Sequence, residues 1–138
     1  MRIMAIDYGD AHTGIAISDP TGFLAGYTTT IDAYRVEVVV ERIIQLIKEY
    51  GVEELVLGHP INMDGTRGPR SEKAHAMKAL LEEQTSLPVI LWDERRTTID
   101  AHQILFNSGK NAKKRKKIVD AVAASLILEG YLTYKKSH

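Results

Sequence analysis

Hydrophobic residues near the N-terminus come in short runs that are separated by turn residues. Residues 3–6 are apolar and lead directly into Asp7 and Gly9, and a second apolar run covers residues 15–17. Residues 23–31 are rich in β-branched side chains, which favour strands. Because the connections between these runs are short, the pattern predicts three strands in an antiparallel meander.

In the middle of the chain the spacing of apolar residues becomes helical. Between residues 36 and 50 the apolar positions recur every three or four residues, and Gly51 follows where a helix typically ends. A run at residues 55–57 then predicts a buried strand, residues 71–85 predict a second helix, and residues 89–92 predict a last strand. Strands that are reached through helices are expected to be parallel.

The final third of the chain is predicted to be helical and is strongly basic. Thr97 or Thr98 can cap a short helix up to Phe106, and a longer helix is expected to reach about Tyr134. Six of the eight residues in the segment 110–117 are positively charged. Because like charges packed so closely oppose a regular helix, this basic tract is expected to begin as a loop.

The order of these elements, β-β-β-α-β-α-β-α-α, predicts an α/β fold. Its mixed five-stranded sheet would consist of the three-strand meander and two parallel strands, with helices on both faces. A chain of 138 residues is long enough for such a core. No linker or internal repeat is visible, so residues 1–138 are expected to form a single domain.

Composition narrows the possible chemistry. The chain contains no cysteine, which excludes disulfides, thiol catalysis and cysteine-ligated zinc. No apolar run approaches the roughly 18 residues of a membrane helix, and the N-terminus lacks a signal pattern. We therefore expect a cytoplasmic protein without a membrane partner, either a monomer or a weak homodimer.

The net charge of zero conceals an uneven distribution. Residues 1–94 contain 8 Lys/Arg and 15 Asp/Glu, a balance of −7, whereas residues 95–138 contain 10 Lys/Arg and 3 Asp/Glu, a balance of +7. A basic region of this kind is a candidate surface for a polyanion such as nucleic acid, although a solvated lysine-rich helix end would look the same.

Acidic residues follow two of the predicted strands and occur again in the last helix. Asp7 ends the first strand, Asp93 and Glu94 end the last one, and Asp120 lies at the margin of the apolar stripe of the final helix. Because parallel strands bring their carboxyl ends to one edge of a sheet, these acids can converge there. Each also has a simpler explanation, such as bracing a turn for Asp7 or pairing with Lys116 for Asp120.

Three carboxylates in one place repel one another unless a divalent cation neutralises them. A set of oxygen ligands without cysteine suits Mg²⁺ or Mn²⁺, as one ion or two, rather than zinc. Such a centre can activate water and stabilise the leaving oxygen when a phosphodiester is cleaved. The sequence leaves open whether Asp93 or Glu94 belongs to the centre, because consecutive strand residues point to opposite faces. The longer side chain of Glu94 favours that residue.

Five segments of the chain resemble the YqgF/RuvX family. They are residues 4–9 (MAIDYG), 14–19 (GIAISD), 58–65 (GHPINMDG), 93–98 (DERRTT) and 120–128 (DAVAASLIL), and they follow the order of the family's motifs over nearly the whole chain. The chain departs from the family pattern at Arg96, where an apolar residue is usual, and near His12, where a basic one is usual.

The resemblance implies a ribonuclease H-like fold and a metal-dependent nuclease. The family is described as processing the 5′ end of precursor 16S ribosomal RNA and as resolving Holliday junctions, so precursor rRNA or branched DNA is the implied substrate. Carried over by position, Asp7, Glu94 and Asp120 would be the catalytic metal ligands, with Asp93 as the weaker candidate of its pair.

Several basic residues are candidates for contacts with nucleic acid. Arg67 and Arg70 belong to the polar loop that follows the fourth strand, and Arg95 follows the acidic pair. The basic tract supplies the others: Lys110, Lys113, Lys114, Arg115, Lys116 and Lys117. His59, at a strand end, is a further candidate, whereas Trp92 is expected in the core.

Two other functional classes fit parts of the pattern. Sugar kinases and actin-like ATPases have this order of elements and an acidic turn near a phosphate, but they close two domains around a nucleotide, which 138 residues cannot provide. A non-catalytic RNA- or ribosome-binding module on the same scaffold is the second class. The presence of all three acids favours a nuclease over that module.

Overall fold

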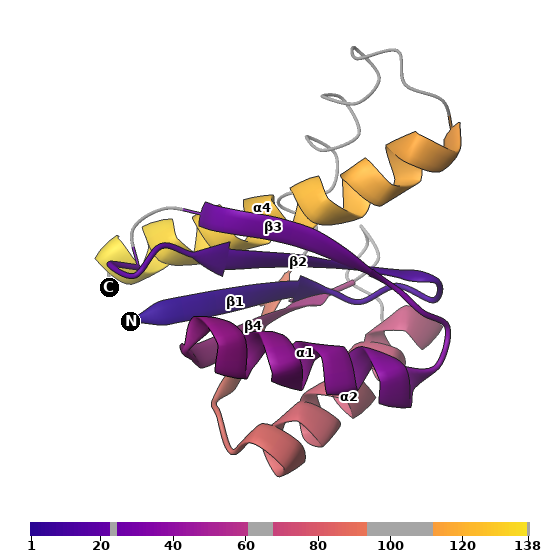
Figure 1. The fold of residues 1–138 in the computed structure, drawn as a ribbon, viewed down its shortest axis with the longest axis horizontal. Helices are drawn as coiled ribbons and strands as arrows, with labels where there is room; N and C mark the ends of the chain where they lie inside the picture. The colour runs from indigo at the N-terminus through magenta and orange to yellow at the C-terminus, as the bar shows by residue number, and fades with distance from the viewer. Residues whose placement is uncertain (23–24, 61–67, 94–111, 138) are drawn as a thin grey trace.

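A computed structural model describes residues 1–22, 25–60, 68–93 and 112–137 of the chain. Within the last of these ranges, the side chains of residues 121–136 are described. Figure 1 shows a central sheet with two helices on one face and a long helix on the other. None of the described helices is both long enough and apolar enough to cross a membrane.

The sheet has the mixed topology that the sequence predicts. β1 (Arg2–Asp7), β2 (His12–Ser18) and β3 (Ala25–Asp32) form an antiparallel meander. β4 (Val52–His59) lies parallel to β1, and β5 (Val89–Asp93) lies parallel to β4. The strand order is β3-β2-β1-β4-β5, so β1 is the central strand.

The helices largely follow their predicted bounds. α1 (Val36–Tyr50) ends at Gly51, whose φ of 68° lies in the left-handed region that glycine adopts without strain. α2 (Pro69–Thr85) begins two residues before the predicted start, because a proline is well suited to the first position of a helix. The predicted helix that ends at Phe106 lies outside the described residues.

The prediction of a loop for the basic tract is wrong from residue 112 onward. The last helix, α4 (Ala112–Ser137), begins at Ala112 and includes the residues from Lys113 to Lys117. Lysine, arginine and alanine have high intrinsic helix propensity, and extending an existing helix by one residue costs much less than nucleating a new one. Propensity and the anchored second half of α4 therefore outweigh the repulsion between like charges.

Two hydrophobic clusters lie on opposite faces of the sheet. Alternate residues of β1 point to the two faces, so that Met4 and Ile6 pack with α1 and α2, while Ile3 and Ala5 pack with α4. These four residues are at most 2% exposed, which is why β1 reads as a continuous apolar run. The face covered by α1 and α2 carries large aliphatic side chains (Ile15, Ile43, Leu46, Leu57, Met77 and Leu81).

The face covered by α4 is packed with smaller residues near the end of β1. Ala5 and Ala16 of the sheet and Ala124 of α4 are fully buried and belong to the same hydrophobic cluster. Further along α4, Tyr131 packs edge-to-face on Trp92 with ring centroids 6.0 Å apart. Trp92 is therefore partly buried and packs against this core cluster, and the alanines allow the helix to approach the sheet closely.

Candidate active site

Asp7 is the last residue of the central strand and is buried. Its exposed fraction is 8%, although aspartate is a residue type that is rarely buried without a partner. Strand alternation puts Asp7 on the same face as Ile3 and Ala5, which is the face covered by α4. A buried carboxylate is costly unless a positive charge or hydrogen-bond donors compensate it.

Glycines stand beside Asp7 on both neighbouring strands. Gly14 of β2 is its direct antiparallel partner. On the other side Ile6 pairs with Leu57, so Gly58 of β4 is the residue next to Asp7. Alternation assigns both glycines to the α4 face, because Ala16 and Val56 belong to the cluster on that face. Neither adjacent strand therefore contributes a side chain beside Asp7.

The predicted acidic pair at the end of β5 is divided by strand alternation. Ile90 and Trp92 belong to the α4 face, whereas Leu91 packs on the opposite one, so Asp93 follows Leu91 onto the face of α1 and α2. Asp93 is thus on the other face of the sheet from Asp7. Glu94, the next residue, lies outside the described residues.

Asp120 belongs to α4, but its side chain lies outside the described part of the chain. It precedes the buried residues Ala123 and Ala124, which are 2% and 0% exposed, by one helical turn. The other end of α4 lies beside the start of β1, because Leu132 and Lys136 line the same hollow as Met1. α4 therefore begins at the end of the molecule where β1 finishes (Figure 1).

Among the described residues, no three histidine, cysteine or acidic side chains are grouped closely enough to hold a metal ion. Two of the three predicted ligands, Glu94 and Asp120, have side chains outside that part of the chain. The structure therefore describes one predicted ligand, Asp7, in full, and the metal-binding set stays a prediction.

A buried histidine links β4 to α2 on the opposite face. His59 Nε2 and Ser71 Oγ are 2.6 Å apart, and the two residues are 6% and 1% exposed. The ring of His75 meets that of His59 edge-on, with centroids 4.8 Å apart. His59 thus joins the end of β4 to the first turn of α2, and no local sequence signal indicates Ser71 as its partner.

One of the predicted basic contacts has a described side chain, and it lies at the start of α2. Arg70 is exposed in the first turn of that helix. Lys73 Nζ donates to Asp10 Oδ1 at 2.7 Å, and this hydrogen bond raises the pKa of the Lys73 ammonium. The bond ties α2 to the turn after β1. Arg67, Arg95 and Lys110 lie outside the described residues, and so do the side chains of Lys113, Lys114, Arg115, Lys116 and Lys117.

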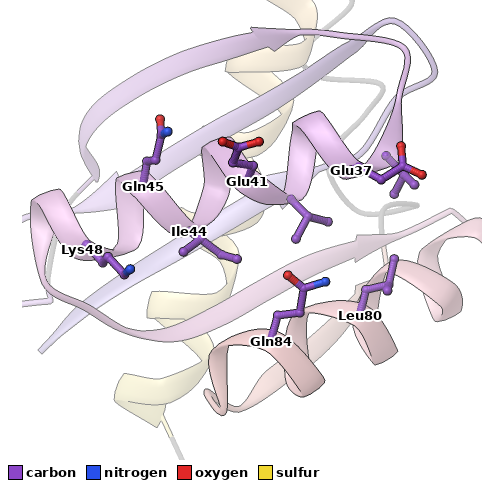
Figure 2. A pocket seen from close by; sticks show the side chains of 9 residues that line it. Glu37, Glu41, Ile44, Gln45, Lys48, Leu80 and Gln84 are labelled. Atoms are coloured by element: carbon purple, nitrogen blue, oxygen red, sulfur yellow. The ribbon is translucent and has the colours of Figure 1, made fainter.

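A groove between α1 and α2 lies away from Asp7. It has a volume of about 560 Å³, and its lining combines apolar side chains, among them Val40, Ile44 and Leu80, with charged and amide side chains. Figure 2 shows Glu37, Glu41 and Gln45 following one another along α1 beside it. Because both helices cover the face opposite to Asp7, this groove is not part of the candidate active site.

Two curated proteins resemble this chain over almost its full length. The relative from Halothermothrix orenii is 45% identical over 135 residues, which cover 98% of this chain and 96% of that protein. The relative from Acetivibrio thermocellus is 46% identical over 138 residues, which cover 98% and 97%. Each is named "Putative pre-16S rRNA nuclease".

Two solved structures with the same fold are resolvases of low sequence identity. Thermus thermophilus RuvC in complex with a Holliday junction substrate has a TM-score of 0.63 at 13% identity, covering 99% of this chain and 96% of that one. The fowlpox virus resolvase in complex with substrate Holliday junction DNA has a TM-score of 0.54 at 14% identity, covering 99% and 98%. These similarities confirm the predicted ribonuclease H-like fold.

The family comparison covers the central strand, the parallel strands and most of α4. The model of the RuvX family, described as "Holliday junction resolvase", matches residues 1–134. Together with relatives that are about 45% identical, this match confirms the predicted family. The chain belongs to the RuvX family.

Proposed function

We propose that this protein is a divalent-metal-dependent endonuclease that hydrolyses phosphodiester bonds in structured nucleic acid. The observation that carries the proposal is the buried carboxylate of Asp7 at the end of the central strand, with glycines on both sides. A buried acid whose neighbours on both adjacent strands carry no side chains suits a hard, oxygen-binding cation, which would neutralise its charge.

The ligand set that we propose is Asp7, Glu94 and Asp120. Asp93 is the weaker member of its pair because alternation in β5 assigns it to the opposite face from Asp7. Asp120 precedes the buried stripe of α4 by one turn, and α4 covers the face of Asp7. All the proposed donors are carboxylate oxygens, which suits Mg²⁺ or Mn²⁺.

The residues of the chain would position the substrate around this centre. Asp7 is held rigidly, because β1 is paired on both sides and buried on both faces. Arg70 and the basic tract supply cations for the phosphate backbone on either side of it. The metal, when bound, would activate water and stabilise the leaving oxygen.

The 5′ end of precursor 16S rRNA is the substrate that we propose, because the relatives of about 45% identity carry the name of a pre-16S rRNA nuclease. A four-way DNA junction is the alternative substrate. It is favoured by the description of the family and by the fold shared with two resolvases.

One preparation of the protein should be tested on precursor rRNA and on a four-way DNA junction, with Mg²⁺, with Mn²⁺ and with EDTA. We expect cleavage of the rRNA that requires the metal and is absent from an Asp7→Asn preparation purified in the same way. Faster cleavage of the junction would favour the alternative substrate. Binding of either nucleic acid without cleavage under any of these conditions would indicate a non-catalytic binding module.

A further inference from the structure

We propose that His12 binds a phosphate of the nucleic acid backbone next to Asp7 and that Asp32 orients its ring. His12 opens β2, and alternation puts it on the α4 face with Gly14, the direct partner of Asp7. His12 and Asp7 are therefore diagonal neighbours in an antiparallel pair, and such residues lie about 7–8 Å apart. At that separation they can contact the same phosphate group or two successive ones. The inference depends on the proposed function only for the nature of the ligand.

The ring of His12 is held in one orientation. His12 and Asp32 are direct cross-strand partners of β2 and β3, and Nδ1 of the histidine lies 2.8 Å from Oδ1 of the aspartate. An ionised carboxylate can only accept hydrogen bonds, so the proton of this contact is on Nδ1. The bond leaves Nε2 directed away from Asp32, and in the imidazolium form Nε2 is a second donor.

Partial exposure leaves His12 accessible to a ligand. Its side chain is 19% exposed and that of Asp32 is 47% exposed. A solvent-exposed pair of this kind contributes little to stability, so a purely structural role would be a small one. In the imidazolium form, the same arrangement presents Nε2–H as a fixed donor to a phosphate oxygen.

The charges at this corner of the sheet also permit an anion to approach. Three carboxylates lie near the turn between β1 and β2: Asp7, Asp10 and Asp32. Lys73 pairs with Asp10 at 2.7 Å and His12 pairs with Asp32 at 2.8 Å. The proposed metal would neutralise Asp7. Gly9 keeps the turn tight, because a Cβ there would lie 2.3 Å from the backbone oxygen of His12.

Two substitutions of His12 separate binding from structure. The amide of asparagine can occupy the position of Nδ1, so His12→Asn retains the contact with Asp32 but lacks a donor at Nε2. His12→Arg provides a phosphate donor of its own. Both should be made in an Asp7→Asn background, so that the substrate is not cleaved, and compared with His75→Asn, an exposed histidine on the opposite face.

The experiment measures equilibrium binding of precursor rRNA and of a four-way junction at several salt concentrations with Mg²⁺. We expect His12→Asn to weaken binding about tenfold and to make the slope of log K against log salt shallower by about 0.7–0.9, the loss of one phosphate contact. His12→Arg should restore the slope, and His75→Asn should leave it unchanged.

Three results would overturn the proposal. An unchanged affinity and salt slope in His12→Asn would assign the residue to the β2–β3 pair alone, while cleavage by the wild type would leave the proposed function intact. The same assignment follows if His12→Asn and His12→Arg lose stability equally in thermal unfolding but bind as the parent does. If the wild type neither binds nor cleaves either nucleic acid, the proposed function fails and this inference fails with it.

Discussion

The two faces of the sheet are built for different tasks. On the face of α1 and α2, large aliphatic side chains fill the core, and His59 is buried in a hydrogen bond with Ser71. On the face of α4, small alanines pack beside β1, and the buried polar groups include the carboxylates of Asp7 and Glu54. One face is therefore filled with large aliphatic side chains, whereas the other combines small residues with buried carboxylates.

The two faces differ in which residues of the central strand β1 point toward them. β1 alternates between them, so each of its residues contributes either to the large aliphatic core or to the surroundings of Asp7. The fully packed face holds the strand in place, and the strand in turn fixes Asp7. A catalytic group on a strand with buried neighbours on both sides is positioned more precisely than one on a loop.

The largest difference in cleavage rate should appear when one acid on each face of the sheet is neutralised and the two variants are compared. We expect Asp7→Asn to lower the cleavage rate by a factor on the order of 10³ or more, because it removes a charge on which the rest of the centre depends. Asp93→Asn, the same substitution on the opposite face, should retain most of the activity. Single-turnover rates with Mg²⁺ measure both.

The melting temperatures of the same variants provide the control. The wild type should gain stability when Mg²⁺ is added, and Asp7→Asn should gain much less, because a ligand that binds only the folded state stabilises it. Equal gains for the wild type and Asp7→Asn would show that Asp7 is not a ligand. A larger loss of activity in Asp93→Asn than in Asp7→Asn would mean that the active centre lies on the face of α1 and α2.

Changes of volume should separate the two cores. Ile43→Ala, in the aliphatic core, should cost about 2–5 kcal/mol of unfolding free energy through the cavity it leaves. Ala124→Leu, under α4, should cost about 1–3 kcal/mol by overpacking, and it should also lower activity because it moves α4 away from the sheet. Urea unfolding and cleavage rates measured on both variants test this contrast. An Ala124→Leu protein with normal activity would contradict it.

Removing lysines near the start of α4 should weaken binding more than removing Lys48 and Lys78 from the opposite layer. Replacing Lys113 and Lys114 of α4 with glutamine should make the salt slope of nucleic acid binding shallower by up to about 1.8 on a duplex, if both residues contact phosphate. Replacing Lys48 and Lys78, on α1 and α2, removes the same charge from the opposite layer and should leave the slope unchanged. Equal slopes in the two double variants would mean that substrate does not approach along α4.

The smallest predicted effect concerns the far end of α4. The Tyr131 hydroxyl donates a hydrogen bond to Glu54 Oε1 at 2.8 Å. Lys135 donates a hydrogen bond to Glu54 Oε2 at 3.0 Å. Burial, and then the hydrogen bond to Glu54, raise the pKa of the Tyr131 phenol. Tyr131→Phe should cost about 1 kcal/mol, the typical contribution of one hydrogen bond, and leave cleavage unchanged.

The same phenol gives a prediction for alkaline pH. Above the ordinary tyrosine pKa of 10.0 the unfolded chain ionises, while the folded phenol stays protonated, so the stability contributed by this group falls as the pH rises. Chemical unfolding between pH 8 and 11 should show a shallower decline for Tyr131→Phe than for the wild type. Parallel declines would mean that Tyr131 does not contribute.

Much of the fold could be predicted from the sequence because its signals are local. The period of apolar residues predicted α1 at its observed bounds and the core of each strand, and Gly51 predicted the end of α1. The motifs around Asp7 and Gly58 predicted the family, which the comparisons confirm. The roles of Asp7, Glu94 and Asp120 as metal ligands stay predictions, and so do the nucleic acid contacts of all the basic candidates.

The start of α4 was not predictable by the same route. The repulsion between like charges favoured a loop, but the helix extends from Ala112 because its packed second half supplies the nucleus. That stabilisation comes from residues more than one turn away. A prediction based only on the charges within the basic tract does not take it into account.

The sequence by itself determined which residues form strands and helices, because alternation and helical period are properties of neighbouring residues. Only the tertiary structure decided which side chains share a face. The register of β1 with β2 and β4 brought Gly14 and Gly58 to Asp7, and the phase of β5 separated Asp93 from it. The pairing of His12 with Asp32 likewise joins residues from two strands. A shift of one residue in any of these registers would exchange the faces, and register depends on the packing of the whole sheet.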